Sequence, residues 1–324
     1  MKLFITGGAG YIGGAVAEAL IEAGHQVTIY DSLATGHRAA VPAGAAFIHA
    51  DLGDQAALEK ALSSGFDAVL HFAAYIEAGE SMSNPGKYYE NNLVNSLRLL
   101  SAAHTAGIPK VLLSSTAALY QTSDEPLTED SPIGPQNVYG ETKLMVENAL
   151  QRYHELHGLR YAALRYFNAA GALPGRGEAH QPESHLIPLT LQVALGQRED
   201  IKIFGSDYPT PDGTCIRDYV HLADLVSAHQ LVLNALDEHD RLIYNLGSGR
   251  GYSVREVLET ARDVTGRPIP AEEAPRREGD PARLVASPAK IQHELGWQPQ
   301  RSGLQDIIAS AWDWHQSYPQ GYDA

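Results

Sequence analysis

The sequence predicts an α/β protein in which a doubly wound parallel sheet is followed by a smaller, mixed α/β C-terminal lobe. Short apolar runs alternate with amphipathic stretches through the first half, as in parallel sheets whose strands are joined by helices. A glycine-rich turn, Gly7–Gly13, joins the first run to the first amphipathic stretch. After Phe167 the alternation stops, and a segment rich in Gly, Ala and Pro follows, which marks the start of the second lobe.

Each expected element follows from its residue pattern. Short apolar runs predict strands at Leu3–Thr6, Val27–Tyr30, Ala45–His49, Ala68–Phe72, Val111–Ser115 and Tyr161–Phe167. Apolar residues at helical spacing predict helices at Ile12–Ala23, Gln55–Ser63, Lys87–Thr105 and Tyr139–His157. A later helix, Leu222–Leu236, and strand, Leu242–Leu246, are expected to return to the main sheet, whereas Asn168–Ser184 is expected to be a loop. We therefore assign residues 1–167, rejoined by about 218–246, to the first domain and residues 168–324 to the second lobe.

The composition limits the classes of function. The chain has 324 residues and a formal charge of −15, which argues against non-specific binding to nucleic acid or to an anionic membrane. Its single cysteine, Cys215, excludes an internal disulfide and a cysteine zinc cluster. No apolar run approaches the roughly 18 residues of a membrane span, and no signal peptide precedes the first strand. We expect a cytoplasmic enzyme or binding protein.

The glycine-rich turn has the spacing Gly7-x-x-Gly10-x-x-Gly13. Glycines at these positions let the backbone approach a pyrophosphate, which binds at the N-terminus of the following helix. Asp31 ends the second strand, where a carboxylate accepts hydrogen bonds from ribose hydroxyls and repels a 2′-phosphate. The pattern predicts a Rossmann-like domain that binds NAD rather than NADP; a glycine turn without a ligand is the alternative.

Tyr139 and Lys143 form a Tyr-x-x-x-Lys pair whose spacing places both side chains on one face of a helix. A free phenol has a pKa near 10 and is a poor base at neutral pH. A neighbouring ammonium favours the phenolate and is expected to lower that pKa. The pair predicts a base beside a nicotinamide, although a surface pair with no chemical role has the same spacing.

Other candidate residues follow the expected strands, at the edge where ligands bind in parallel sheets. Asp51 could contact an adenine or, equally, cap the next helix. The small residues of Phe72–Ala74 would let a cofactor pass over the strand ends, unless they only pack well there. In Ser114–Thr116 a hydroxyl could hydrogen-bond both a substrate hydroxyl and Tyr139, or could satisfy loop backbone instead.

The second lobe carries arginines that suit a diphosphate, because guanidinium groups bind phosphate oxygens bidentately. The candidates are Arg217, Arg276 and Arg277. Equally, they could be surface arginines paired to Asp218, Glu278 or Asp280.

The histidines offer no recognised zinc pattern. His154 and His157 share a helix, and His180, Glu183 and His185 share a loop, but neither spacing is that of a known zinc motif. We expect no metal site.

Several longer motifs point to one family. They are Arg165–Asn168, Ile203–Thr214, Arg217–His221, Tyr244–Gly247, Ala274–Asp280 and the terminal stretch His315–Tyr322. Together with the glycine turn and the Tyr-x-x-x-Lys pair they resemble the UDP-glucose 4-epimerase (UDP-galactose 4-epimerase) family of the extended short-chain dehydrogenase/reductase superfamily. The resemblance covers nearly the whole chain. It implies that UDP-glucose and UDP-galactose are interconverted through a 4-keto sugar, with NAD bound throughout.

The resemblance also implies roles for individual residues. Tyr139 would take the proton of the sugar 4-hydroxyl, Thr116 would relay it, and Lys143 would bind the nicotinamide ribose. The cofactor would contact Gly7, Gly10, Tyr11, Ile12, Gly13, Asp31, Asp51, Leu52, Phe72, Ala73, Ala74, Asn91, Ser114, Tyr139, Lys143 and Tyr166. The substrate would contact Thr116, Asn168, His185, Leu186, Phe204, Arg217, Tyr219, Arg277, Asp280 and Leu284. The family commonly forms homodimers through the helices at Lys87–Thr105 and Tyr139–His157, and we expect one here.

Rival functions stay open. The related 4,6-dehydratases carry Asp-Glu where this chain has Ala117 and Ala118, so elimination of water has no obvious catalyst. Ala117 and Ala118 do not argue against a UDP-glucuronate 4-epimerase. A non-catalytic NAD(H)-binding sensor is the rival from another class, although Thr116, Tyr139 and Lys143 are all present.

The chain also departs from the family pattern. His185 stands where Asn is common, Ile76 where some members carry Lys, and Gln121 where Gly is usual. Leu284 stands where some members have a bulky Tyr and others a small Cys, so we expect some activity on UDP-N-acetylglucosamine and UDP-N-acetylgalactosamine.

Overall fold

The computed structural model describes residues 1–277 and 280–322. They form two compact units. The first comprises Met1–Gln121, Pro132–Arg165 and Val226–Tyr244, and the second comprises Thr122–Ser131, Tyr166–Leu225 and the described chain from Asn245 onward.

The first unit is built on a seven-stranded sheet with the strand order β10-β6-β5-β4-β1-β2-β3. Its strands are β1 (Lys2–Thr6), β2 (Gln26–Asp31), β3 (Ala46–His49), β4 (Ala68–His71), β5 (Lys110–Thr116), β6 (Arg160–Tyr166) and β10 (Arg241–Leu246). Neighbouring strands run parallel, for example β1 beside both β2 and β4. The strand order reverses between β1 and β4, and this switch point is where doubly wound sheets bind ligands. The expected doubly wound parallel sheet is therefore confirmed.

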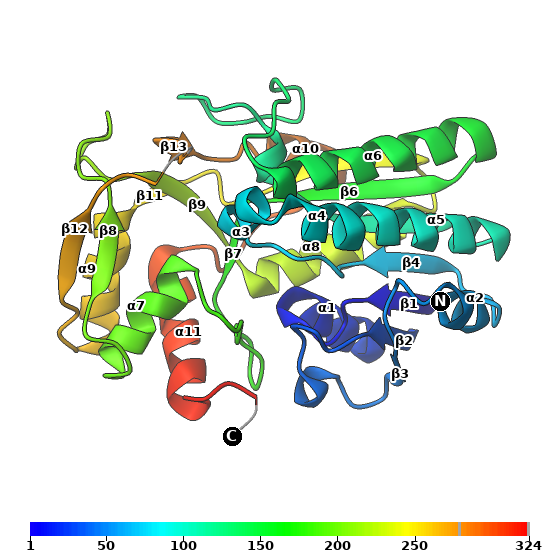
Figure 1. Cartoon of the computed structure of the whole chain (residues 1–324), viewed down its shortest axis with the longest axis horizontal. Coiled ribbons are helices and arrows are strands. Elements are labelled where there is room, and N and C mark those ends of the chain that lie inside the picture. The colour runs from blue at the N-terminus through cyan, green and yellow to red at the C-terminus, as the bar shows by residue number, and fades with distance from the viewer. Residues whose placement is uncertain (278–279, 323–324) are drawn as a thin grey trace. The chain divides into compact units, whose positions relative to one another are not determined.

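Helices cover both faces of this sheet. They are α1 (Tyr11–Glu22), α2 (Gln55–Leu62), α3 (Ala78–Ser83), α4 (Pro85–Tyr88), α5 (Asn95–Thr105), α6 (Val138–His157) and α8 (Leu222–Ala235). Helices α5 and α6 lie side by side on one face (Figure 1). Helix α1 lies on the other face, where its Ala19 carbonyl accepts a hydrogen bond from Gln230 of α8. Leu99, Leu150 and Tyr161 are fully buried or nearly so in the core under α5 and α6.

The helix expected at Lys87–Thr105 is not continuous. A π-helical turn, Tyr89–Val94, separates α4 from α5, and the short helix α3 precedes them. Asn92 in this turn is buried. Its side-chain amide accepts a hydrogen bond from the Tyr75 N–H and donates one to the Tyr75 carbonyl, both at 2.9 Å. These polar contacts join residues that are distant in the sequence. Helical periodicity therefore predicted a helix in this segment but could not predict its interruption.

The second unit is organised around β9 (Ile216–His221), which pairs with β7 (Asn168–Ala170), β11 (Gly251–Ser253) and β13 (Arg283–Leu284). A separate parallel pair joins β8 (Ile201–Phe204) to β12 (Ala271–Ala274). The loop expected at Asn168–Ser184 was wrong at its start, because Asn168–Ala170 pairs in parallel with Tyr219–His221. Three residues are too few to show a strand pattern without their partner.

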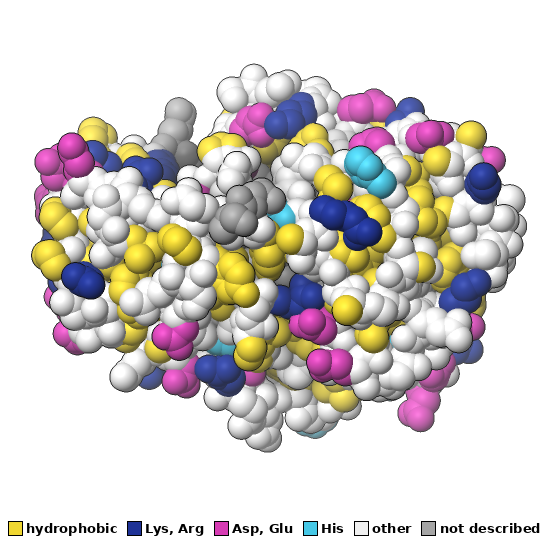
Figure 2. All heavy atoms as spheres, turned by 90° about the horizontal axis from the view of Figure 1, so that it is seen from below, with side chains coloured by type: hydrophobic (Ala, Val, Ile, Leu, Met, Phe, Trp, Pro, Cys, Tyr) yellow, Lys and Arg dark blue, Asp and Glu magenta, His cyan; other side chains and the backbone are white. Residues whose placement is uncertain are grey.

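Helices complete the second unit. They are α7 (Leu186–Ala194), α9 (Val254–Thr265), α10 (Ala289–Leu295) and α11 (Leu304–Ser317). Leu191, Val257 and Ile307 are fully buried between α7, α9 and α11. Among the described residues, none of the helices is long and apolar enough to cross a membrane. Figure 2 shows acidic and basic side chains interspersed on the face drawn, so charges there occur singly or in small groups.

Candidate functional site

The glycine-rich turn packs closely against the end of β4. Gly7 has a φ of +74°, and a Cβ there would lie 2.5 Å from the backbone nitrogen of Ala73. A Cβ on Gly13 would lie 2.3 Å from the Gly7 carbonyl oxygen. Both positions therefore need glycine for the fold itself.

Gly10 is different, and it supports a cofactor. Its φ of −92° is open to any residue, and a Cβ there would meet only the Gly7 oxygen, at 3.3 Å. The backbone conformation does not demand glycine at this position, and the one close contact of a Cβ is much less severe than those at Gly7 and Gly13. Gly10 is the N-cap of α1, where a side chain would fill the space in which a pyrophosphate approaches the helix N-terminus. The turn thus fits a dinucleotide.

Asp31 holds the same turn from the end of β2. Its carboxylate accepts a 2.9 Å hydrogen bond from the backbone N–H of Ala9 and a 2.8 Å bond from that of Leu33. The carboxylate is buried beside the glycine turn, and its orientation is fixed by both bonds. A carboxylate held in this way is ready to accept ribose hydroxyls.

Asp51 does not cap the next helix, so that alternative was wrong. The N-cap of α2 is Asp54, whose side chain accepts the N–H of Ala57 at 3.0 Å. Asp51 instead accepts the N–H of Gly53 at 2.7 Å, and the Asp51 side chain is exposed. The neighbouring Leu52 is buried.

The candidate proton-transfer residues come together at the end of β5 and the start of α6. Thr116 is the last residue of β5, and its side chain lies beside the Tyr139 phenol, where it acts to lower the pKa of that group. Lys143, one turn after Tyr139, donates a 2.7 Å hydrogen bond to the Ser114 carbonyl oxygen. The structure therefore brings Thr116, Tyr139 and Lys143 together, as the sequence predicted.

The expected lowering of the Tyr139 pKa is not found. Burial raises the pKa of Tyr139 to about 12, although the nearby Thr116 side chain opposes this shift. Burial also lowers the pKa of Lys143 to about 8. Lys143 aims its amino group at the Ser114 carbonyl, and desolvation of the phenol outweighs the effect that spacing alone suggested.

A buried ion pair lies one helical turn beyond Lys143. Glu147 accepts hydrogen bonds from Nε and Nη2 of Arg165 at 3.1 and 2.7 Å, and both side chains are less than one-tenth exposed. Ser115 also donates to Glu147, and Arg165 donates to the Tyr120 hydroxyl at 2.7 Å. The pair ties α6 to β5 and β6. Glu147 was not predicted from the sequence, because its only signal was an acidic residue at a buried helix position.

A second buried network holds the start of α6. The Ser81 hydroxyl accepts the backbone N–H of Tyr139 at 3.1 Å, and the Thr142 hydroxyl donates to the Tyr139 carbonyl at 2.8 Å. Asn92 reaches Thr142 at 3.4 Å. Asn91, the residue expected to touch the cofactor, donates to Asn92 at 3.0 Å. The π-helical turn thus positions the helix that carries Tyr139.

In the second unit, strand β9 gathers several expected substrate residues. Register pairs Tyr219 with Asn168 on β7, and Arg217 with Leu284 on β13. The Arg217 guanidinium donates a 2.7 Å hydrogen bond to Asp280. One of the surface pairings considered as an alternative therefore exists, and it involves a residue that the resemblance also places at the substrate.

The adjacent arginines Arg276 and Arg277 have different surroundings. Arg276 lies over the Tyr208 ring and pairs with Asp207 at 2.7 Å, at the surface. Arg277 lies over the Phe204 ring at 4.0 Å, beside the end of the β8–β12 pair. The charges of both Arg217 and Arg277 act on the buried Cys215 thiol and lower its pKa, against the larger effect of burial. Of the other two partners considered, Glu278 lies outside the described residues. The pairing with Asp218 was wrong, because Asp218 is fully buried and accepts hydrogen bonds from the backbone of Ser248, Gly249 and Ala286.

Two further substrate candidates flank α7. His185 is the residue before the helix, and Leu186 is its first residue. The His185 ring contacts Glu178 and Glu183 at 2.9 and 2.7 Å. These carboxylates, after the opposing effect of burial, raise the pKa of His185 to about 11.

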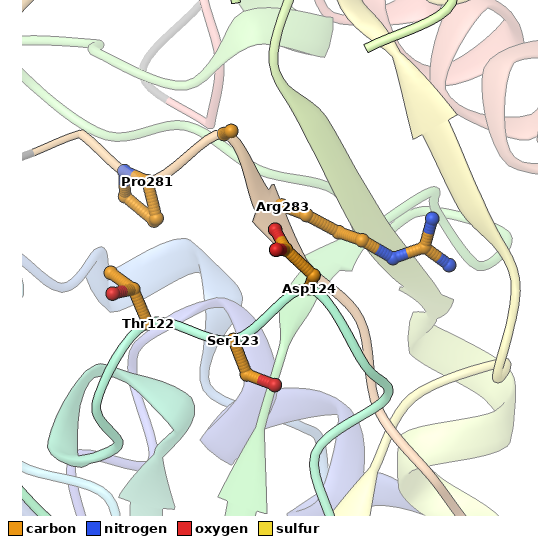
Figure 3. Close-up of a pocket in the computed structure, with 6 residues that line it drawn as sticks. Thr122, Ser123, Asp124, Pro281 and Arg283 are labelled. Carbon is orange, nitrogen blue, oxygen red and sulfur yellow. The ribbon is translucent and has the colours of Figure 1, made fainter. Parts of the chain in front are cut away.

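A hollow of about 280 Å³ opens beside Asp280 and Leu284 in the second unit. Figure 3 shows Thr122, Ser123 and Asp124 on a loop along one side of the hollow, and Pro281 and Arg283 on a second segment. The Arg283 Nε is buried without a hydrogen-bond partner in the described part of the chain. None of these lining residues was predicted from the sequence to be functional.

The doubly wound fold, the dinucleotide turn and the Thr-Tyr-Lys cluster define a short-chain dehydrogenase-like nucleotide-sugar enzyme. Residues 3–247 match the NAD dependent epimerase/dehydratase family. The chain is 50% identical to a UDP-glucose 4-epimerase of Streptomyces lividans, over 99% of this chain and 98% of the relative. This protein belongs to the NAD dependent epimerase/dehydratase family, and its cofactor is NAD.

Solved structures are similar over the whole chain. A crystal structure of a UDP-glucose 4-epimerase superposes with a TM-score of 0.97 at 49% identity, over 100% of both chains. The UDP-glucose 4-epimerase from Bifidobacterium longum, in complex with NAD⁺ and UDP, gives a TM-score of 0.95 at 34% identity, over 99% of this chain and 100% of that one. These similarities confirm the resemblance that the motifs indicated.

Proposed function

We propose that this chain interconverts UDP-glucose and UDP-galactose by reversible oxidation at C4 of the hexose. The observation that carries the proposal is that Thr116, Tyr139 and Lys143 lie together where β5 ends and α6 begins, in the unit that also holds the glycine turn. Relatives of nearly the same length and about half-identical sequence are UDP-glucose 4-epimerases. NAD, when bound, supplies the acceptor and donor of hydride at C4.

Residues of the first unit would hold the cofactor and move the proton. The glycine turn and Asp31 suit the pyrophosphate and adenosine ribose, and Lys143 suits the nicotinamide ribose. Tyr139 takes the proton of the sugar 4-hydroxyl through Thr116, and later returns it. Because the pKa of Tyr139 is about 12, the phenolate needs positive charge nearby, which Lys143 supplies from the protein.

Residues of the second unit would hold UDP. Arg217 and Arg277 provide guanidinium groups for the diphosphate, whereas Asp280 keeps Arg217 in place. The 4-keto sugar must turn over so that hydride returns to its opposite face. Firm contacts to UDP and few charged contacts to the sugar suit that requirement.

The dehydratase alternative is disfavoured by Ala117 and Ala118, which follow Thr116 without a carboxylate. One experiment separates the alternatives. The purified chain is incubated separately with UDP-galactose, UDP-N-acetylgalactosamine and UDP-galacturonate, without added NAD, and products are identified by NMR. We expect UDP-glucose from the first. A dehydrated 4-keto-6-deoxy sugar would establish a dehydratase, and conversion of UDP-galacturonate alone a UDP-glucuronate epimerase. No product at all would favour the sensor.

The breadth of the sugar pocket depends on Leu284. This half-buried residue is smaller than Tyr, so we expect measurable epimerisation of UDP-N-acetylgalactosamine. Leu284→Tyr should reduce kcat/KM for the acetylated substrate and leave that for UDP-galactose within a few-fold. Equal kcat/KM of both proteins on the acetylated sugar would refute this assignment.

A homodimer is also part of the proposal. Leu97 on α5 and Leu156 on α6 are 40% and 73% exposed, and apolar side chains on adjacent helices suit a two-fold interface. Light scattering at micromolar concentration should give twice the chain mass. A monomeric mass would refute the dimer.

A further inference from the structure

We propose that the segment Glu178–His185 is a zinc site, with Glu178, His180, Glu183 and His185 as its ligands. One donor atom from each of these residues lies within 4.8 Å of the others. Two imidazole nitrogens and two carboxylate oxygens form a donor set that suits Zn²⁺, and imidazole also favours Co²⁺ and Ni²⁺.

The distances are close to those of a four-coordinate site. Nδ1 of His180 and Nδ1 of His185 lie 3.1 and 2.9 Å from the same Glu178 oxygen. Nδ1 of His185 lies 2.7 Å from Glu183 Oε1. Zinc binds such atoms at about 2.0–2.2 Å. Two neighbouring donor atoms of a tetrahedral site therefore lie slightly more than about 3 Å from each other. These three contacts would lengthen by a few tenths of an ångström, and the more distant donors, all within 4.8 Å of one another, would close on the ion.

The ligands are held in place by the surrounding chain. The backbone N–H groups of Ser184 and His185 both donate to Glu183 Oε1 at 2.8 Å. Glu178 is only 7% exposed, so its carboxylate is confined to this cluster. Hydrogen bonds of this kind, which orient a metal-binding carboxylate, are a regular part of protein metal sites.

Burial and charge give a reason for a cation here. Two carboxylates share this small space, and the side chains of Glu178 and Glu183 are each only 7% exposed. A divalent ion would lie between the two carboxylates and the two imidazoles and would replace the direct contacts between histidines and glutamates. His185 precedes the first residue of α7, so the ion would fix the loop that leads into this helix.

The sequence did not indicate this site. The spacing Glu178-x-His180-x-x-Glu183-x-His185 is not a recognised zinc pattern, and the expectation was that no metal would bind. Glu178 could not be identified as a ligand from sequence spacing, because the direction of its side chain depends on how the loop folds. The proposal does not depend on the proposed epimerase activity.

The test uses untagged full-length protein, stripped with a chelator and titrated separately with ZnCl₂ and CoCl₂. We expect one ion per chain, a visible absorption spectrum typical of tetrahedral Co²⁺, and a rise in Tm with zinc. His180→Gln and Glu183→Gln should each weaken zinc binding by roughly 100-fold, because loss of a ligand lowers metal affinity at least as much as loss of a residue that only supports a ligand. Circular dichroism of the metal-free variants checks that they fold.

His157→Gln is the matched control. His157 stacks on His104 with ring centroids 4.2 Å apart, so it belongs to another close pair of imidazoles. The His157→Gln variant should bind zinc with the same affinity as the parent protein. Absence of a tetrahedral Co²⁺ spectrum, or zinc affinity that His180→Gln and Glu183→Gln leave unchanged, would overturn the proposal. Equal weakening in His157→Gln would do so as well.

Discussion

Lys143 donates a 2.7 Å hydrogen bond from its amino group to the backbone carbonyl of Ser114. This bond joins α6, which carries Tyr139, to β5, which ends in Thr116. Lys143 is only 3% exposed, so its charge acts in a region of low dielectric constant. The three residues of the candidate proton path therefore share one rigid junction, and its properties can be tested residue by residue.

Tyr139→Phe should remove the proton acceptor without changing the fold. Loss of general acid–base catalysis typically reduces rates by about 100- to 10,000-fold, and we expect kcat on UDP-galactose to fall in that range. NAD content, measured by absorbance after denaturation, should stay unchanged. Tyr153→Phe, on the same helix, should keep near-normal kcat. Activity of Tyr139→Phe within tenfold of the parent would exclude the phenol from the reaction.

The ion pair between Glu147 and Arg165 should be costly to break and much less costly to replace. Leaving one buried charge without its partner destabilises a protein by about 3–5 kcal/mol. We expect Glu147→Gln to lower the free energy of unfolding in urea by this amount. The double variant Glu147→Leu with Arg165→Met should be more stable than Glu147→Gln.

The exposed pair Arg152–Glu155 is the control for this prediction. Its side chains are 75% and 38% exposed, so Glu155→Gln should cost less than about 1 kcal/mol. Similar losses of unfolding free energy for Glu147→Gln and Glu155→Gln would show that the buried pair contributes no more to stability than the exposed pair.

His71 predicts a loss of stability in acid. Burial lowers its pKa to about 3, and its ring contacts Thr6 and Ser96 at 2.6 and 2.7 Å. The unfolded chain binds this proton below its ordinary pKa of 6.5, whereas the folded chain does not, so stability falls as the pH falls through 6.5. Between pH 8 and pH 5, His71 alone should remove roughly 2 kcal/mol.

His71→Gln should flatten this part of the pH profile, as measured by chemical unfolding at each pH. His157→Gln, which changes an exposed residue of α6, should retain the slope of the parent protein. An unchanged slope in His71→Gln would mean that His71 is not the group responsible.

The neighbouring arginines of the second unit offer a matched comparison. Arg277→Leu should raise KM for UDP-galactose by roughly 10- to 100-fold, because a charge-assisted hydrogen bond to the diphosphate contributes about 1.5–3 kcal/mol. Arg276→Leu should have little effect, since Arg276 pairs with Asp207 at the surface. Equal changes in KM would contradict the assignment of Arg277 to the diphosphate.

Local patterns were enough to predict the sheet and the centre of the site. Gly7, Gly13 and Asp31 follow from the geometry of one strand–turn–helix unit, and the Tyr139–Lys143 spacing follows from one helix. The π-helical turn, Asn92 and Glu147 could not be predicted, since each depends on contacts between distant segments. The raised pKa of Tyr139 shows the same limit, because spacing gives the neighbour of a group and not its burial.

The measurement that tests the central claim most directly uses UDP-galactose labelled with deuterium at C4 of the hexose. The labelled substrate is incubated in ordinary water without added NAD, and UDP-glucose is analysed by mass spectrometry and NMR. If hydride leaves and returns at C4 while Tyr139 carries only the hydroxyl proton, the product retains deuterium at C4. UDP-glucose that has lost its deuterium to solvent, or no UDP-glucose at all, would contradict the account.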